Sequence, residues 1–225
     1  MRVNGRWAAI GAGALLGVVC LAAASLYPAE RFVPAENSTW ADLYRHLNAE
    51  EYESLTEAQQ YALNDVPLTA EGQAELPATL GDVSIATTQG YLYADTEETP
   101  GLFDSATGYI LANGETDGSL YGFTNLSLHV EIGDAQIVCN TGLGVTAPVP
   151  ELLVVTAVYD EQSDCYVGVS SVRKEDADLC EAETTFPSAG CSDWTVQAIG
   201  VISAPEGCAG SGALLTKVTG AAANG

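Results

Sequence analysis

Basic residues are scarce in this chain, which has 7 lysines and arginines against 30 aspartates and glutamates, a net charge of −23. Between Arg45 and Arg173 there is no basic residue, although 20 carboxylates occur there. Nucleic acids and anionic membrane surfaces are bound through lysine and arginine. Both kinds of partner are therefore excluded, and most of the carboxylates must be solvated, cation-bound or protonated rather than paired.

Histidine is almost as scarce, and the two present are His46 and His129. A serine hydrolase needs a histidine base, but neither lies near a Gly-x-Ser-x-Gly elbow, a pattern that does not occur in the sequence. Metalloprotease, Walker-type and dinucleotide-binding glycine motifs are also missing. We therefore predict no catalytic residue and no cofactor. A surface hydrolase that uses paired carboxylates stays as the alternative, because their proximity depends on the fold.

The cysteines lack the Cys-x-x-Cys pairs of a zinc site. One of the six, Cys20, lies in an apolar segment, and the other five are Cys139, Cys165, Cys180, Cys191 and Cys208. Outside the cytoplasm we expect these five to form disulfides, with the pairing left open. Five cysteines leave one thiol over, which either bridges to a second chain or stays buried.

Long apolar runs are missing except for one, residues 8–27, which Arg2 and Arg6 precede. Two interpretations stay open. A helix of about 20 residues crosses a bilayer core of about 30 Å, and the run also fits a secretory signal with small residues near a cleavage point. In both cases the positive-inside rule places residues 28–225 outside the cytoplasm. We expect a membrane-anchored protein with a cytoplasmic stub at residues 1–7, or a secreted one if the segment is cleaved.

Small residues line one face of this segment if it is helical. Ala9, Gly13 and Gly17 repeat at a spacing of four. In lipid, such a face lets another helix approach closely. This pattern predicts a protein partner or self-association through the anchor.

The composition resembles that of exported proteins from salt-loving archaea or bacteria, with many carboxylates and two lysines, Lys174 and Lys217. The segment EEYESLTEAQQYAL, residues 50–63, resembles a short helical segment of haloarchaeal exported proteins. This resemblance implies an exported protein and carries no activity with it.

Residues 28–80 are expected to form a stalk and short helices. Thr39 or Ser38 begins the first helix, and Asp42 completes a capping box. Thr56 begins the second with Gln59 in the same role, and Pro67 stops it.

The sequence from 81 to 219 has the pattern of strands. Short runs rich in β-branched and aromatic residues are separated by turn dipeptides, and they lie at 83–86, 91–94, 109–112, 120–132, 135–139, 152–159, 165–172, 194–203 and 214–218. An irregular stretch is expected at 173–193 and a flexible tail at 220–225. Strands at hairpin intervals predict a mainly β fold, an antiparallel β-sandwich or barrel.

Two acidic loops are candidates for a structural calcium ion, because hard cations need several converging oxygens. The candidate ligands are Asp95, Glu97, Glu98 and Asp104 in one loop, and Asp160, Glu161 and Asp164 in the other. Asn37 and Asn125 begin glycosylation sequons, and Asn37 is the better placed. The chain as a whole is thus expected to be an exported, non-catalytic acidic domain that acts by protein contact, as a surface component or an accessory subunit of a membrane complex.

Overall fold

The computed structural model describes residues 30–69, 72–73, 79–80, 83–84, 102–111, 120–132, 136–187, 193–208 and 212–221. The expected anchor or signal at residues 8–27, with Ala9, Gly13 and Gly17, lies outside these ranges. Among the residues that are described, no helix is long and apolar enough to cross a membrane.

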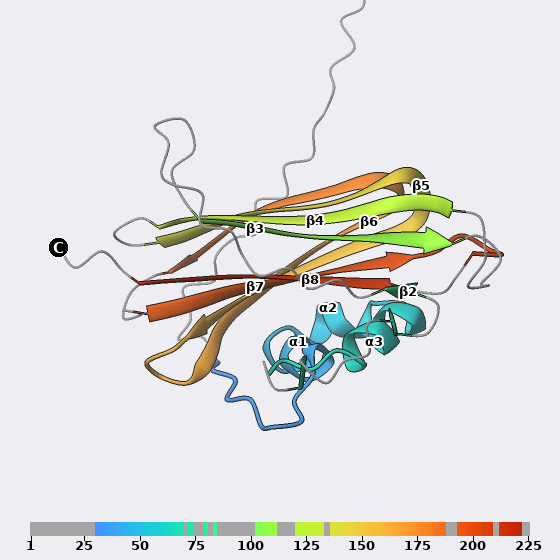
Figure 1. Ribbon diagram of the computed structural model, residues 1–225. Coiled ribbons are helices and arrows are strands. Elements are labelled where there is room, and N and C mark those ends of the chain that lie inside the picture. The colour runs from blue at the N-terminus through green and yellow to red at the C-terminus, as the bar shows by residue number, and fades with distance from the viewer. Residues whose placement is uncertain are drawn as a thin grey trace, which may run out of the picture.

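An antiparallel sheet of six strands dominates the structure, in the order β3-β4-β5-β7-β8, with β6 paired to β5. The strands of the sheet are β3 (Leu102–Leu111), β4 (Leu120–Ile132), β5 (Gln136–Asp160), β6 (Cys165–Pro187), β7 (Asp193–Ser203) and β8 (Gly212–Ala221). Two further short strands, β1 (Thr79–Leu80) and β2 (Val83–Ser84), pair with each other. The sheet curls into a nearly closed barrel (Figure 1), so the expected mainly β, antiparallel fold is confirmed.

Strand β5 is 25 residues long and joins two segments that the sequence pattern predicts as separate strands. In its first half every second residue is buried, from Ile137 to Val145, as expected when one face meets water. From Leu152 to Val158 every residue is buried. The β5–β6 register shifts between Gly144 and Val149, where the strand bends. One half of β5 is therefore open to solvent on one side, and the other half is covered on both.

The β5–β6 hairpin folds over at this bend and contributes to both sides of the barrel. The first half of β5 pairs with β4 and the end of β6, and the second half pairs with β7 and the start of β6. Inside the barrel, a Cβ placed on Gly168 would lie 2.6 Å from Cδ1 of Phe186, near the far end of the same strand. The expectation of an irregular stretch at 173–193 is wrong, because β6 continues through it to Pro187.

The barrel is completed where β3 lies beside β8, the two strands at the ends of the strand order (Figure 1). The described strand pairings include no ladder between them. Instead, the carboxylate of Asp104 on β3 accepts a hydrogen bond from the backbone N–H of Lys217 on β8, at 2.8 Å. This side chain therefore links the two strands directly.

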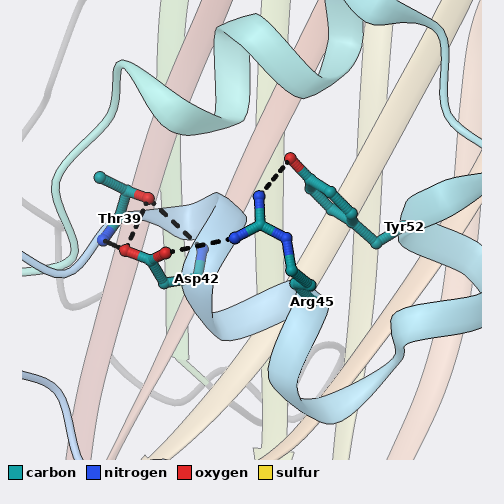
Figure 2. Close-up of polar contacts among 4 residues, drawn as sticks. All are labelled: Thr39, Asp42, Arg45 and Tyr52. Atoms are coloured by element: carbon teal, nitrogen blue, oxygen red, sulfur yellow. Dashed lines mark hydrogen bonds and ion pairs between the residues drawn. The ribbon is translucent and has the colours of Figure 1, made fainter.

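Three short helices precede the sheet: α1 (Trp40–Leu47), α2 (Ala49–Glu53) and α3 (Glu57–Asn64). The capping boxes Thr39/Asp42 and Thr56/Gln59 are both present, as predicted. Figure 2 shows the first box and the neighbouring guanidinium of Arg45, which donates to the hydroxyl of Tyr52 at 3.0 Å.

The helices cover one side of the barrel (Figure 1). Their apolar side chains pack against the second half of β5 and against β6, β7 and β8, and the largest buried members of this core are Trp40, Tyr44, Leu63, Leu153, Tyr166 and Ile199. A separate core fills the barrel interior. This cover explains why the second half of β5 and strand β7 are buried on both faces, while β3, β4 and the first half of β5 face solvent on their outer side.

Candidate functional site

The hydrogen-bonded cluster of Tyr44, Ser171 and Glu51 is the described arrangement that most resembles a catalytic group. The Tyr44 hydroxyl donates to Glu51 Oε2 at 2.9 Å and contacts Ser171 Oγ, which itself donates to Glu51 at 2.7 Å. Burial, and the nearby Glu51 charge, raise the pKa of Tyr44 well above its usual value. Tyr44 therefore stays a protonated donor and cannot serve as a base for Ser171. The cluster joins α1 and α2 to β6 and has a structural role.

The acidic turn between β5 and β6 has its carboxylates occupied by local hydrogen bonds. Asp160 accepts from the N–H of Gln162 at 3.1 Å and from the hydroxyl of Ser163 at 2.6 Å. Glu161 accepts from Thr195, and Asp164 accepts from Tyr159. The three carboxylates that the sequence suggested as calcium ligands therefore have three separate sets of partners.

Of the four candidate ligands in the first calcium loop, the structure describes one, Asp104. Asp104 lies in β3 with its side chain inside the barrel and is 1% exposed. Asp95, Glu97 and Glu98 lie outside the described ranges. Across the part of the chain that the structure describes, no group of three or more histidine, cysteine or acidic residues could hold a metal ion.

Asp104 is nonetheless an unusual residue, because its second carboxylate oxygen is buried and has no hydrogen-bond partner among the described groups. The Thr216 hydroxyl is in the same situation, and Thr216 precedes the Lys217 N–H that binds Asp104. Burial raises the pKa of Asp104, and the hydrogen bond from Lys217 opposes that rise. The group is a buried polar part of the seam between β3 and β8.

The expected disulfides are not formed among the cysteines that the structure describes: Cys139, Cys165, Cys180 and Cys208 are free. Cys180 lies opposite Leu143, four residues along β5 from Cys139. At about 3.3 Å per residue this offset is about 13 Å, well beyond the ~7 Å limit for bridged Cα atoms. Cys165 lies at the other end of the hairpin, opposite Asp160. Cys191 lies outside the described ranges.

Two of these thiols also lie where burial disfavours the thiolate. Burial raises the pKa of Cys139 to about 12 and that of Cys180 to about 11. A reactive cysteine requires the thiolate, which a raised pKa disfavours at neutral pH. Neither residue is a candidate nucleophile.

The histidines and sequons lie at the surface. The exposed ring of His46 packs near Phe32, with 5.3 Å between ring centroids. The partly buried His129 lies on the outer face of β4, with its Nδ1 3.7 Å from Glu131. Asn37 is exposed in a turn and Asn125 is exposed in the middle of β4. No histidine is joined to a serine or cysteine nucleophile by a hydrogen bond among those described.

The uncovered outer face of β3, β4 and the first half of β5 remains as the candidate site, and we name these outward positions the open face. It includes the cross-strand pair Tyr109 and Phe123, which are 41% and 60% exposed. No outward residue is a carboxylate from Phe103 to Tyr109 or from Phe123 to His129. The helices cover the opposite side of the barrel, so no element that the structure describes packs on this apolar-and-polar surface.

Sequence reasoning missed this face, although a signal for it was present. The alternation of Leu126, Leu128 and Val130 with Ser127 and His129 predicts which side of β4 faces water. Extending the same alternation back from Ser127 through Asn125 places Phe123 on the water-facing side. An aromatic residue at a water-facing position of a strand is the signal in the sequence for an exposed contact surface.

Comparisons with protein-family models, with characterised proteins and with solved structures find no match to this chain.

Proposed function

We propose that this chain is an exported, membrane-anchored, non-catalytic domain that acts by contact with a partner protein of the cell surface or of a membrane complex. The observation that carries the proposal is the one-sided cover of the barrel. Helices bury one side, whereas the opposite side presents exposed aromatics among outward positions of β3 and β4 that carry no carboxylate between Phe103 and Tyr109 or between Phe123 and His129. Exposed apolar groups of this kind commonly mark interaction sites.

Charge supports the choice of a contact role. A surface with a net charge of −23 stays soluble by self-repulsion. A stretch without carboxylates on such a surface is where another molecule can approach without that repulsion. Two of the cations are engaged within the chain: Arg45 interacts with Asp42 and Tyr52, and Arg173 donates to the backbone of Ser54.

The alternative, a hydrolase with paired carboxylates, receives less support. Glu51, Asp160, Glu161 and Asp164 each accept hydrogen bonds from neighbouring side chains. These interactions use the acceptor oxygens that an acid–base pair would direct at a substrate.

Extraction of the full chain from its own membrane tests the proposal. We expect a partner to co-purify in detergent with the native chain and with Tyr61→Ser, but not with Phe123→Ser. Tyr61 is a matched control because it is 68% exposed on α3, away from the open face. Amino-terminal sequencing of the membrane fraction should begin at or near Met1. Three results would each contradict the anchored contact role: an amino terminus after residue 24, loss of the partner from both variants, and loss of the partner from neither variant.

A further inference from the structure

The centre of the open face is built from small, uncharged side chains. Its floor consists of Ser105, Thr107, Asn125, Ser127, Gly142 and Gly144, which lie in register across β3, β4 and β5. Among the described residues, the outward carboxylate of Glu181 on β6 lies directly opposite Gly142, and Glu131 lies four residues beyond Ser127 on β4. Hydroxyl and amide groups therefore cover a region of sheet in a chain that is otherwise rich in carboxylates.

The two glycines add no side chain to this floor, and the Ser127 hydroxyl lies over Gly142, donating to its carbonyl at 3.3 Å. Gly144 lies opposite Asn125 in the register, and a Cβ placed on it would have Leu179 Cδ1, at 3.8 Å, as its nearest side-chain contact. The position above this glycine is thus in ordinary van der Waals contact with Leu179 of β6. The Asn125 amide donates one long hydrogen bond to the Ala106 carbonyl, at 3.4 Å. An amide carries two donors and an acceptor, so it retains capacity for a ligand.

Tyr109 and Phe123 are two neighbouring aromatic side chains at one end of the floor. They are direct cross-strand neighbours, a position in which Cβ atoms lie about 5 Å apart. Both rings are substantially exposed to solvent, which is unfavourable for an isolated domain. A ligand with a flat, nonpolar C–H surface would cover the rings, while its polar groups could reach the hydroxyls and amides beside them.

The chemistry of the floor discriminates among possible occupants. The core of a protein interface is about 65% apolar, whereas hydroxyls, amides and glycines make up this floor. A second copy would bring its own charge of −23 into contact, and anionic ligands would meet a surface without lysine or arginine. An uncharged sugar chain fits, since its rings present C–H faces edged with hydroxyl groups.

We propose that the open face binds an uncharged glycan, carried by the partner glycoprotein on the outer side of the membrane. This inference rests on the proposed contact function and names the chemical group that the contact recognises. Tyr109 and Phe123 stack on the sugar rings, and Asn125, Ser127 and Thr107 hydrogen-bond to the sugar hydroxyls.

Saturation-transfer NMR and titration calorimetry with free neutral oligosaccharides test this directly. The probes are maltohexaose, cellohexaose, mannohexaose and chitohexaose, each added alone to the full chain in molar NaCl and a detergent without a sugar headgroup. We expect at least one probe to bind, and Phe123→Ser and Tyr109→Ser each to lower its association constant about tenfold, the scale of losing one buried aromatic contact. Tyr61→Ser should bind as the native chain does. The three substituted positions are exposed, so we expect each variant to fold as the native chain does. Circular dichroism checks the fold of each variant before titration.

Three outcomes would overturn the glycan inference. The first is no binding of any probe, or binding that Tyr61→Ser weakens as much as Phe123→Ser does. The second is an intact mass showing that Asn125 of the native protein already carries a glycan, which would occupy the face. The third is a partner that stays bound after chemical deglycosylation. That last result would reject the glycan as the recognised group while leaving the proposed protein contact standing.

Discussion

At the scale of single residues, Asp104 shows how the structure departs from a reading of composition. The sequence groups it with nearby carboxylates as a loop ligand, but it lies inside the barrel and accepts from the Lys217 N–H. Alternation could not reveal this, because an inward aspartate in a strand looks like an interruption of the pattern. Its role depends on the contact between β3 and β8, which are far apart in the chain.

Substitution of Asp104 by asparagine should stabilise the protein at neutral pH. The folded-state pKa of Asp104 is raised, so its contribution to stability is fully present below the unfolded pKa and is lost as pH rises through the folded one. An amide keeps the oxygen that accepts from Lys217 and removes the buried charge. We expect Asp104→Asn to raise the free energy of unfolding at pH 7 by about 1 kcal/mol, measured by urea denaturation.

The control for this prediction is Asp178→Asn, because Asp178 is exposed on β6 and its loss relieves only the general negative charge. The gain at Asp104 should exceed that of the control at pH 7 and vanish at pH 3, where the native carboxyl is protonated. If Asp104→Asn instead lowers stability at pH 7, the ionised Asp104 carboxylate is the better partner for the Lys217 N–H between β3 and β8.

At the scale of elements, local signals were reliable and long-range ones were not. The capping residues Thr39 and Thr56 predicted both main helix starts, since a cap acts within a few residues. Strand β4 was predicted with its full bounds because its turns and alternation are local. The fold of the β5–β6 hairpin was missed, because the bend keeps strand geometry on both sides and the charged outward residues of β6 resemble a loop.

The folded hairpin itself can be tested at Gly168. A Cβ at this position would lie 2.6 Å from the ring of Phe186, which belongs to the other half of β6. We expect Gly168→Ala to lower the free energy of unfolding by about 1–3 kcal/mol, as overpacking of a filled core does. Thermal melts of Gly144→Ala provide the comparison, because its added methyl would lie 3.8 Å from its nearest neighbour, Leu179 Cδ1. Equal effects of the two substitutions would show that the halves of β6 do not meet in this way.

At the scale of the whole molecule, the charge distribution predicts a dependence on salt. The 20 carboxylates between Arg45 and Arg173 repel one another in the folded domain more than in the expanded chain. The Debye length falls from about 10 Å at 0.1 M salt to about 3 Å at 1 M. We expect the melting temperature to rise markedly between these salt concentrations.

Sodium chloride and sodium sulfate should be compared in this measurement, because salting-out ions also strengthen apolar burial. A rise in both salts supports screening of the carboxylates. Stability that instead grows mainly as pH falls toward 4, and little with salt at pH 7, would point to relief by protonation and an acidic habitat. Asp104→Asn would then help to separate the buried carboxyl from the surface ones.

Photo-cross-linking in the native membrane at molar salt tests the central claim, contact through the open face, most directly. A photoreactive residue placed at Thr107, exposed in the centre of that face, is compared with one at Tyr61 on the helical side. We predict one discrete cross-linked species from position 107, lost when Phe123→Ser is added, and none from position 61. The same species from both positions, or a species at 61 alone, would contradict the claim that this protein acts through its uncovered sheet face.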